Sequence, residues 1–348
     1  MKILLTGNMG YIGPCVEKQL LSAMPGVELV GLDLGYFAHC LTHAHVLPET
    51  RINSQLFMDV RSIPDEVFAG VDTVIHLAAI SNDPMGNFFE EPTVEINADA
   101  TERVALAAKK AGVKNFVYAS SCSMYGSSGS EARTEEAELN PLTAYARSKV
   151  FSEGVISRLA DDNFIVTSLR FATACGMSER LRLDLVLNDF VAGAAVDKKV
   201  TILSDGTPWR PLITVTDMAR AIEWAAVRPL DNGGSFVAVN VGSDAWNYQV
   251  KDLAEAVADV IGGVDVSINS DAAPDKRSYS VDFSRFAKLA PDHQPVSTLE
   301  GTIKELYEGL CAMNFQESNF RDTWYMRLKV LREHVENDRL NSRLSWNK

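Results

Sequence analysis

Tyr145 and Lys149 stand four positions apart in the stretch Tyr-Ala-Arg-Ser-Lys, so a helix would carry both side chains on one face. A phenol has a reference pKa of about 10, which is too high for an efficient base at neutral pH. A nearby ammonium group stabilises the phenolate, and we expect Lys149 to lower the pKa of Tyr145. By itself such a pair is common on exposed helices. Ser120 and Ser121, however, close the preceding predicted strand with hydroxyl groups that could polarise a carbonyl, which indicates acid–base chemistry.

Three glycines near the N-terminus predict a phosphate site. Gly7, Gly10 and Gly13 follow the apolar strand 2–6 and open a segment with helical spacing over 11–21. The first glycine permits a tight turn, the second lets a pyrophosphate approach the backbone, and the third lets helix and strand pack closely. The start of the helix presents free N–H groups to the anion.

Asp33 indicates which nucleotide would bind at this turn. It ends the predicted strand 27–32, about 20 residues after Gly13, where a ribose-binding carboxylate is expected. A carboxylate accepts hydrogen bonds from the adenosine 2′-hydroxyl and repels a 2′-phosphate. No arginine or lysine occupies the neighbouring positions 8, 9, 34 and 35 to reverse this preference. The sequence therefore favours NAD over NADP.

Composition excludes several classes of partner. The 348 residues carry a net charge of −13, which repels nucleic acid and anionic membranes. An apolar content of 46% is ordinary for a soluble globular protein, and no apolar run approaches the roughly 18 residues of a membrane span. We expect a cytoplasmic protein with free thiols at its five cysteines. The segment 39–45 contains three histidines and one cysteine, but we interpret it as a surface loop and expect no metal site.

Hydrophobic periodicity predicts two lobes and a terminal extension. Up to Phe171 strands and helices alternate, as in a parallel sheet with crossover helices; the expected strands are 2–6, 27–32, 54–58, 72–79, 115–121 and 164–169, with helices at 11–21, 98–111 and 142–160. Farther on we expect helices at 183–196, 215–227, 250–261 and 298–313 and strands at 200–203 and 236–241. The predicted domains are 1–172, a substrate lobe 173–313 with segments that can return to the sheet, and a helical extension 314–348.

The glycine turn, the strand-end serines and the Tyr/Lys pair, in this order, resemble the extended short-chain dehydrogenase/reductases, the NAD-dependent nucleotide-sugar epimerases and dehydratases. The glycine spacing GxxGxxG, the segment His76–Ala79, the segment Leu169–Phe171 and the stretch from Ser204 to Asp217 carry the same likeness, which covers the chain to about Met313. The resemblance implies an α/β fold, a Rossmann-type doubly wound parallel sheet with a smaller C-terminal lobe. It also implies NAD as cofactor, a nucleotide-diphosphate sugar as substrate, and a homodimer formed through helices 98–111 and 142–160.

The resemblance assigns roles to individual residues. Tyr145 is the implied acid/base, Lys149 its electrostatic partner and a ribose ligand, and Ser121 the donor to the reacting oxygen. The implied cofactor-binding residues are Gly7, Met9, Gly10, Tyr11, Ile12, Asp33, Asp59, Val60, Leu77, Ala78, Ala79, Ala119, Tyr145, Lys149 and Phe171. The implied substrate-binding residues are Ser121, Cys122, Ser123, Thr173, Arg180, Arg182, Arg210 and Arg277. For Arg180 and Arg182, surface ion pairs are an equally good interpretation.

Departures from the family pattern narrow the reaction. Hexose 4,6-dehydratases of this family carry two acids directly after the catalytic Ser or Thr, whereas this chain has Cys122 and Ser123, so dehydration is disfavoured. A packed thiol is the favoured role for Cys122. The leading hypothesis is epimerisation at C4 through a transient 4-keto sugar. A 4-ketoreductase or dehydrogenase would use the same residues, and a non-catalytic NAD-binding protein is the rival from another class.

Overall fold

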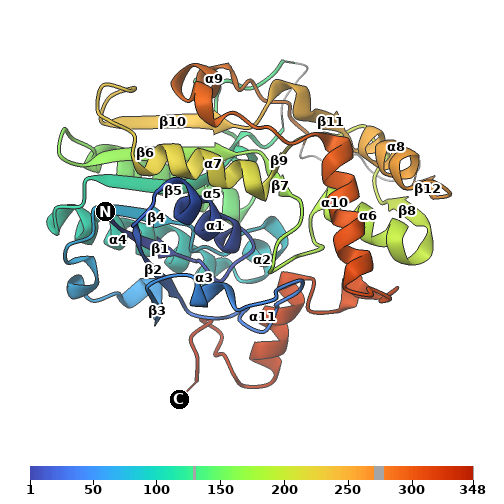
Figure 1. Ribbon diagram of the computed structural model, residues 1–348, viewed down its shortest axis with the longest axis horizontal. Coiled ribbons are helices and arrows are strands. Elements are labelled where there is room, and N and C mark those ends of the chain that lie inside the picture. Colours follow the sequence, from blue (N-terminus) through green and yellow to red (C-terminus); the bar gives the residue numbers. More distant parts are fainter. Residues whose placement is uncertain (128–130, 270–277, 348) are drawn as a thin grey trace.

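A computed structural model describes residues 1–127, 131–269 and 278–347. Its centre is a seven-stranded parallel sheet in the order β10-β6-β5-β4-β1-β2-β3 (Figure 1). The strands are β1 (Lys2–Thr6), β2 (Glu28–Asp33), β3 (Ser54–Phe57), β4 (Thr73–His76), β5 (Asn115–Ser121), β6 (Ile165–Phe171) and β10 (Phe236–Val241). This confirms the predicted α/β class and the doubly wound parallel sheet.

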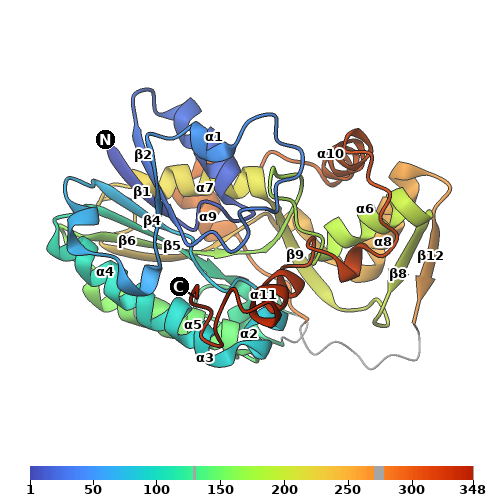
Figure 2. The same cartoon turned by 90° about the horizontal axis from the view of Figure 1, so that it is seen from below.

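Helices cover both faces of the sheet, so both faces of its inner strands are buried. In β1, Ile3 and Leu5 belong to one buried cluster and Leu4 to the other. One face is covered by α1 (Gly13–Ala23) and α7 (Val215–Ala226), which pack against each other. On the opposite face lie α3 (Glu90–Val94), α4 (Ala100–Lys110) and α5 (Ala144–Leu159), as Figure 2 shows. The short helix α2 (Asp83–Phe88) packs beside α3 and α5.

The strand order reverses between β1 and β4. From β1 the chain proceeds outward through β2 and β3, and then returns to build β4, β5 and β6 on the other side. At such a switch point the crossover helices diverge, which opens a crevice outside the carboxyl ends of the strands. The glycine turn follows β1, Asp33 ends β2, and Ser120 and Ser121 end β5, so all of them meet at this edge of the sheet.

A smaller lobe stands beside this crevice. It contains a three-stranded sheet, a parallel two-stranded pair and three helices that pack together. Its elements are β7 (Thr173–Cys175), β9 (Trp209–Thr214), β11 (Asn247–Gln249), β8 (Lys199–Ile202), β12 (Asp265–Ile268), α6 (Val186–Asp197), α8 (Val250–Ile261) and α10 (Leu299–Ala312). The strand and helix predicted at 236–241 and 215–227 are instead β10 and α7 of the central layer, since β10 pairs along its whole length with β6.

Several sequence expectations need correction in this lobe. The short strands β7, β9, β11 and β12 were not predicted, because three to six residues leave little room for a periodic pattern. The helix expected from 183 begins only at Val186. Leu183 lies in a bend, where its N–H donates to the carbonyl of Tyr325 at 3.0 Å instead of to a helical partner. Between α7 and α10 the chain also forms α9 (Ser284–Leu289) beside β10.

The C-terminal extension folds back under the nucleotide side of the sheet. It forms α11 (Arg327–Glu336), which contacts α2, and then runs on past β2 and β3 (Figure 1). In the part of the chain that the structure describes, no helix combines the length and apolar character needed to span a bilayer.

Candidate active site

The glycine turn closes tightly over the end of β4. Gly7 has a φ of +76°, and a Cβ at this residue would lie 2.5 Å from the backbone nitrogen of Ala78. A Cβ on Gly13 would lie 1.8 Å from the carbonyl oxygen of Asn8. Ile12 precedes α1 without a side-chain cap, and the first turn carries no acidic residue. The exposed N–H groups and the close backbone approach fit a pyrophosphate.

Asp33 is fixed beside this turn by two backbone hydrogen bonds. Its carboxylate accepts from the N–H of Met9 at 3.0 Å and from the N–H of Gly35 at 2.8 Å. Burial raises the pKa of Asp33, and these two hydrogen bonds oppose the rise. Met9 contributes only its backbone, because its buried side chain lies behind the cavity wall. The carboxylate itself lines the cavity, as a ribose ligand must.

One cavity of about 950 Å³ joins most of the expected site residues. Its walls contain the whole predicted cofactor set except Met9, so the residues present fit NAD. His76, directly before Leu77, is buried behind the wall and bonds to Thr6 and Thr101. The predicted residues in the walls are Gly7, Gly10, Tyr11, Ile12, Asp33, Asp59, Val60, Leu77, Ala78, Ala79, Ala119, Ser121, Ser123, Tyr145, Lys149, Phe171, Thr173, Arg182 and Arg210.

Tyr145 occupies the first turn of α5 and is positioned from both sides. Thr143 caps the helix by accepting from the N–H of Ala146 at 3.1 Å, and its hydroxyl donates to Asp83 at 2.6 Å. Helix α2 approaches so closely that a Cβ on Gly86 would lie 3.0 Å from the Cβ of Tyr145. The backbone that carries the phenol is therefore held by a cap and a close helix contact.

Lys149 lies one turn farther along α5 and points to the end of β5. Its ammonium donates to the carbonyl of Ala119 at 2.6 Å and lies 5.7 Å from the centre of the Tyr145 ring. The side chain is 3% exposed, and burial lowers the pKa of Lys149 to about 7. The amine is therefore near its titration midpoint at neutral pH.

The expected lowering of the Tyr145 pKa is wrong for this structure. Burial raises the pKa of Tyr145 to about 12; a hydrogen bond with Ser121 and the charge of Arg182 oppose the rise, while the charge of Asp83 adds to it. The reason is that phenol and amine are desolvated together, so each favours its neutral form. In this state Tyr145 is a proton donor.

Asn97 supports this wall from behind, in a way that sequence reasoning missed. Its side chain exchanges hydrogen bonds with the backbone of Ile80 at 2.8 and 3.0 Å and donates to the hydroxyl of Ser148 at 3.1 Å. It lies in a π-helical turn, Glu95–Asp99, directly before α4. Such turns are often found at functional sites. The signal that could have identified Asn97 is a buried polar residue within an otherwise apolar helix face.

Of the two residues after Ser121, Ser123 lines the cavity and Cys122 does not. The buried thiol of Cys122 lies outside the cavity wall and donates to the carbonyl of Arg170 at 3.1 Å. Burial raises its pKa, so it is a packed thiol and not a substrate ligand. Ser123 lines the cavity beside Ser121.

The four predicted arginines separate in the same way. Arg180 is 1% exposed and lies outside the cavity wall, where it pairs with Glu49 and donates to the carbonyl of Ala38 at 2.8 Å. It is therefore a buried structural residue, neither a substrate ligand nor a surface ion pair. Arg182 and Arg210 line the cavity. Arg277 lies outside the described residues.

Arg182 is held firmly in the cavity wall. It donates to Asp184 at 2.5 and 2.9 Å and to the hydroxyl of Ser81 at 2.9 Å. This ion pair is buried, so removing one partner would leave an uncompensated charge. The other partner, Asp184, accepts from Asn82 at 2.9 Å.

The C-terminal extension adds two arginines to the wall that the sequence did not identify. Arg321 donates two 2.8 Å hydrogen bonds to Asp189, and Arg327 donates to the carbonyl oxygens of Arg180 and Leu181 at 2.8 and 3.1 Å. Both line the cavity. The family resemblance ends near Met313 and gave no reason to place them there. The mixture of charge and helical spacing after Phe320 was the only signal.

The loop expected at the surface over 39–45 is partly buried. Cys40 is covered, and His39 lies 5.4 Å from His334 of α11 between ring centres. Among residues 1–127, 131–269 and 278–347, no group of three or more His, Cys, Asp and Glu side chains is placed to hold a metal ion.

The sequence that forms this fold and site matches the model of a known protein family. Residues 3–242 match the NAD dependent epimerase/dehydratase family, which is more than half of the 348 residues. The chain belongs to this family. Its members are NAD-dependent sugar-nucleotide epimerases and dehydratases, so the chain is an enzyme and NAD is the family's cofactor.

Particular relatives include both reaction types. The uncharacterized UDP-glucose epimerase YtcB of Bacillus subtilis (strain 168) is 28% identical over 274 residues, covering 75% of this chain and 83% of the relative. UDP-glucose 4-epimerase of Lactobacillus helveticus is 27% identical over 284 residues, with coverage of 75% and 82%. dTDP-glucose 4,6-dehydratase of Streptomyces griseus is 28% identical over 292 residues, with coverage of 82% and 87%.

The fold is shared with solved structures. UDP-glucuronic acid 4-epimerase from Bacillus cereus, in complex with UDP-glucuronic acid and NAD, superposes with a TM-score of 0.76 at 22% identity and covers 90% of this chain and 100% of its own. At this level of identity the likeness concerns the fold alone.

Proposed function

We propose that this chain is an NAD-dependent nucleotide-sugar epimerase that inverts C4 through a transient 4-keto sugar. The observation that carries the proposal is the arrangement of one cavity. Ser121, Tyr145 and Lys149 line the same cavity as the glycine turn, Asp33 and Arg182. Dinucleotide and sugar nucleotide could then meet at the phenol.

Each catalytic side chain has a distinct task in this proposal. The glycine turn and Asp33 would hold NAD, which would supply reversible hydride transfer at C4. As the phenolate, Tyr145 would remove the C4 hydroxyl proton during oxidation, and as the phenol it would give the proton back during reduction. Ser121 donates a hydrogen bond to the reacting oxygen. Lys149, 5.7 Å from the Tyr145 ring, stabilises the phenolate when it forms.

Three arginines in the cavity wall support a diphosphate ligand. Arg182, Arg210 and Arg321 line the cavity, and a guanidinium group can bind two phosphate oxygens at once. Arg277 stays a prediction for the same ligand. Several relatives are named as UDP-glucose epimerases, which supports a uridine diphosphate sugar as the first substrate to test.

Two residues argue against dehydration by the family's usual route. Cys122 and Ser123 follow Ser121 where two acids would be needed, and the Cys122 thiol lies outside the cavity wall. Neither of the two positions directly after Ser121 carries a carboxylic acid. The same catalytic set would serve a dehydrogenase, which releases reduced cofactor, or a ketoreductase, which consumes it.

The test is a turnover assay with UDP-glucose, UDP-N-acetylglucosamine and UDP-glucuronic acid, followed by NMR of the sugar and by absorbance at the NADH band. We expect a mixture of C4 epimers with no stoichiometric NADH. Stoichiometric NADH would instead identify a dehydrogenase, and a 4-keto-6-deoxy product a dehydratase.

A homodimer and a cytoplasmic location stay predictions. Exposed apolar side chains support the dimer, since Leu106 of α4 and Phe151 of α5 are 47% and 50% exposed on helices of one face. Light scattering of Phe151→Glu beside the unmodified chain tests it, and a monomeric mass for both would exclude the dimer.

A further inference from the structure

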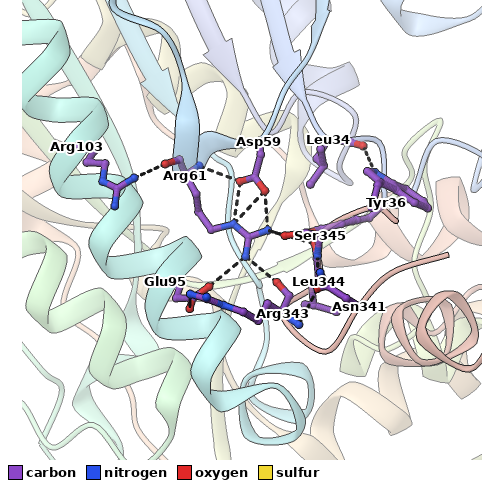
Figure 3. A network of polar contacts seen from close by, with 11 residues as sticks. Leu34, Tyr36, Asp59, Arg61, Glu95, Arg103, Asn341, Arg343, Leu344 and Ser345 are labelled. Carbon is purple, nitrogen blue, oxygen red and sulfur yellow. Dashed lines mark hydrogen bonds and ion pairs between the residues drawn. The ribbon is translucent and has the colours of Figure 1, made fainter. Parts of the chain in front are cut away.

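The last residues of the chain form a folded segment beside the nucleotide end of the cavity. We call residues 341–347 the C-terminal strap. Leu344 is fully buried, and the N–H of Asn347 donates to the carbonyl of Arg339 at 2.9 Å, which closes the segment on itself. Figure 3 shows the strap against the connections that follow β2 and β3.

The strap holds the connection after β2 through hydrogen bonds. The hydroxyl of Tyr36 donates to the carbonyl of Leu344, and the indole of Trp346 donates to the carbonyl of Leu34 at 2.8 Å. The Trp346 ring also lies 6.1 Å from the ring of Tyr36 between centres. Leu34 and Tyr36 line the cavity next to Asp33. The strap thus fixes the wall that faces the adenosine ribose.

Arg61 ties the strap to the connection after β3. On one side it donates to the carboxylate of Asp59 at 2.6 to 3.0 Å, and on the other it donates to the carbonyl of Arg343 at 2.6 Å and the hydroxyl of Ser345 at 2.9 Å (Figure 3). Asp59 lines the cavity, whereas Arg61 and the strap do not. Glu95 pairs with both Arg61 and Arg343, which anchors the network to the helical layer.

We propose that the C-terminal strap and Arg61 are positioning residues that retain NAD by holding Leu34, Tyr36 and Asp59 around its adenosine end. The strap contacts the wall segment of Leu34 and Tyr36 directly and that of Asp59 through Arg61, so we expect a dinucleotide to leave more slowly while these bonds are intact. This rests on the proposed function, because an epimerase restores its cofactor in every cycle and gains from keeping it bound.

The experiment compares a chain that ends at Leu340 with the full chain. Both are loaded with radiolabelled NAD, chased with excess unlabelled NAD, and followed by filter binding. We expect label to leave the shortened chain at least tenfold faster, with a Kd for NAD raised to a similar extent. Turnover at saturating NAD should stay within twofold, since the strap contacts neither Tyr145 nor Arg182.

Point variants keep the test decisive if the shortened chain fails to fold. Trp346→Ala should accelerate release, and Trp346→Phe, which keeps a ring and loses the donor, should fall between it and the full chain. Arg339→Ala is the matched control, because it removes an exposed arginine side chain just before the strap. Its release rate should equal that of the full chain.

The outcomes separate the two proposals. If the full chain, the folded chain that ends at Leu340 and Trp346→Ala all release NAD at the same rate, the proposed role of the strap is wrong, whatever the turnover. A full chain that binds no NAD overturns it as well. Faster release from the variants, in a chain that epimerises none of the sugar nucleotides, supports the strap and removes the proposed function.

Discussion

The Tyr145 side and the Arg182 side of the cavity are held by different kinds of contact. Tyr145 is positioned by its own backbone, through the Thr143 cap and the close approach of Gly86. Arg182 is positioned by charge, through Asp184 and the surrounding polar side chains. A backbone contact is insensitive to single polar substitutions, whereas a buried ion pair depends on both partners. We therefore expect the Tyr145 contacts to govern the chemistry and the Arg182 contacts to govern substrate selectivity.

The largest expected effect comes from removing the phenolic hydroxyl. Tyr145→Phe should lower kcat by about 10³-fold, in the range typical of a lost acid/base, with little change in the Kd for NAD. Progress curves by NMR and NAD titration measure both. If Tyr145→Phe kept its turnover, another group would carry the proton transfer, and the contrast between Tyr145 and Arg182 would no longer hold.

Removing charge on the other side should act on binding. Arg182→Ala should raise the KM for a sugar nucleotide by about 10- to 100-fold, since a charge-assisted contact to phosphate is lost and Asp184 is left unpaired. Initial rates over a substrate series give kcat and KM separately. Arg180→Ala is the matched control; it should lower the melting temperature and leave the KM of the folded protein unchanged. An equal rise in KM for both variants would contradict the distinction between them.

A methyl group added between α2 and α5 directly tests the backbone contact that positions Tyr145. Gly86→Ala places a Cβ 3.0 Å from that of Tyr145, so we expect the phenol to shift by a fraction of an ångström and kcat to fall by about tenfold, with a smaller change in KM. Gly154→Ala, whose added Cβ meets only the end of the Arg158 side chain at 3.9 Å, is the control on α5. Equal kcat values for the two variants would show that the helix contact is not needed.

The smallest expected effect is on stability. Burial lowers the pKa of Lys149 to about 7 in the folded protein without cofactor, so between about pH 7 and 10 the unfolded chain binds more protons and stability rises with pH. Lys149 should contribute up to about 1.4 kcal/mol per pH unit to that slope. Urea unfolding of the unmodified chain and Lys149→Met at pH 7, 8 and 9 measures it. Identical slopes would show that Lys149 stays charged in the folded state.

Sequence reasoning placed residues in the cavity wall correctly where the signal lies in neighbouring positions of the chain. Gly7 and Asp33 are recognisable because a turn needs a glycine and a strand end needs an acid at set spacings. Arg321 was out of reach, since its partner Asp189 is 132 positions away and no periodic pattern links them. The pKa of Tyr145 was mispredicted for a related reason, because the degree of desolvation is a property of the packed wall and not of the Tyr/Lys spacing.

The C-terminal strap also makes the two chain ends unequal as points of attachment. Met1 is 48% exposed and directly precedes β1 at the amino edge of the sheet, opposite the edge where the cavity lies. Trp346 and Ser345, in contrast, are in contact with the network beside Asp59. A purification tag fused after the last residue would pull on that network, so a protein tagged there would be isolated with less dinucleotide than one tagged at the other end.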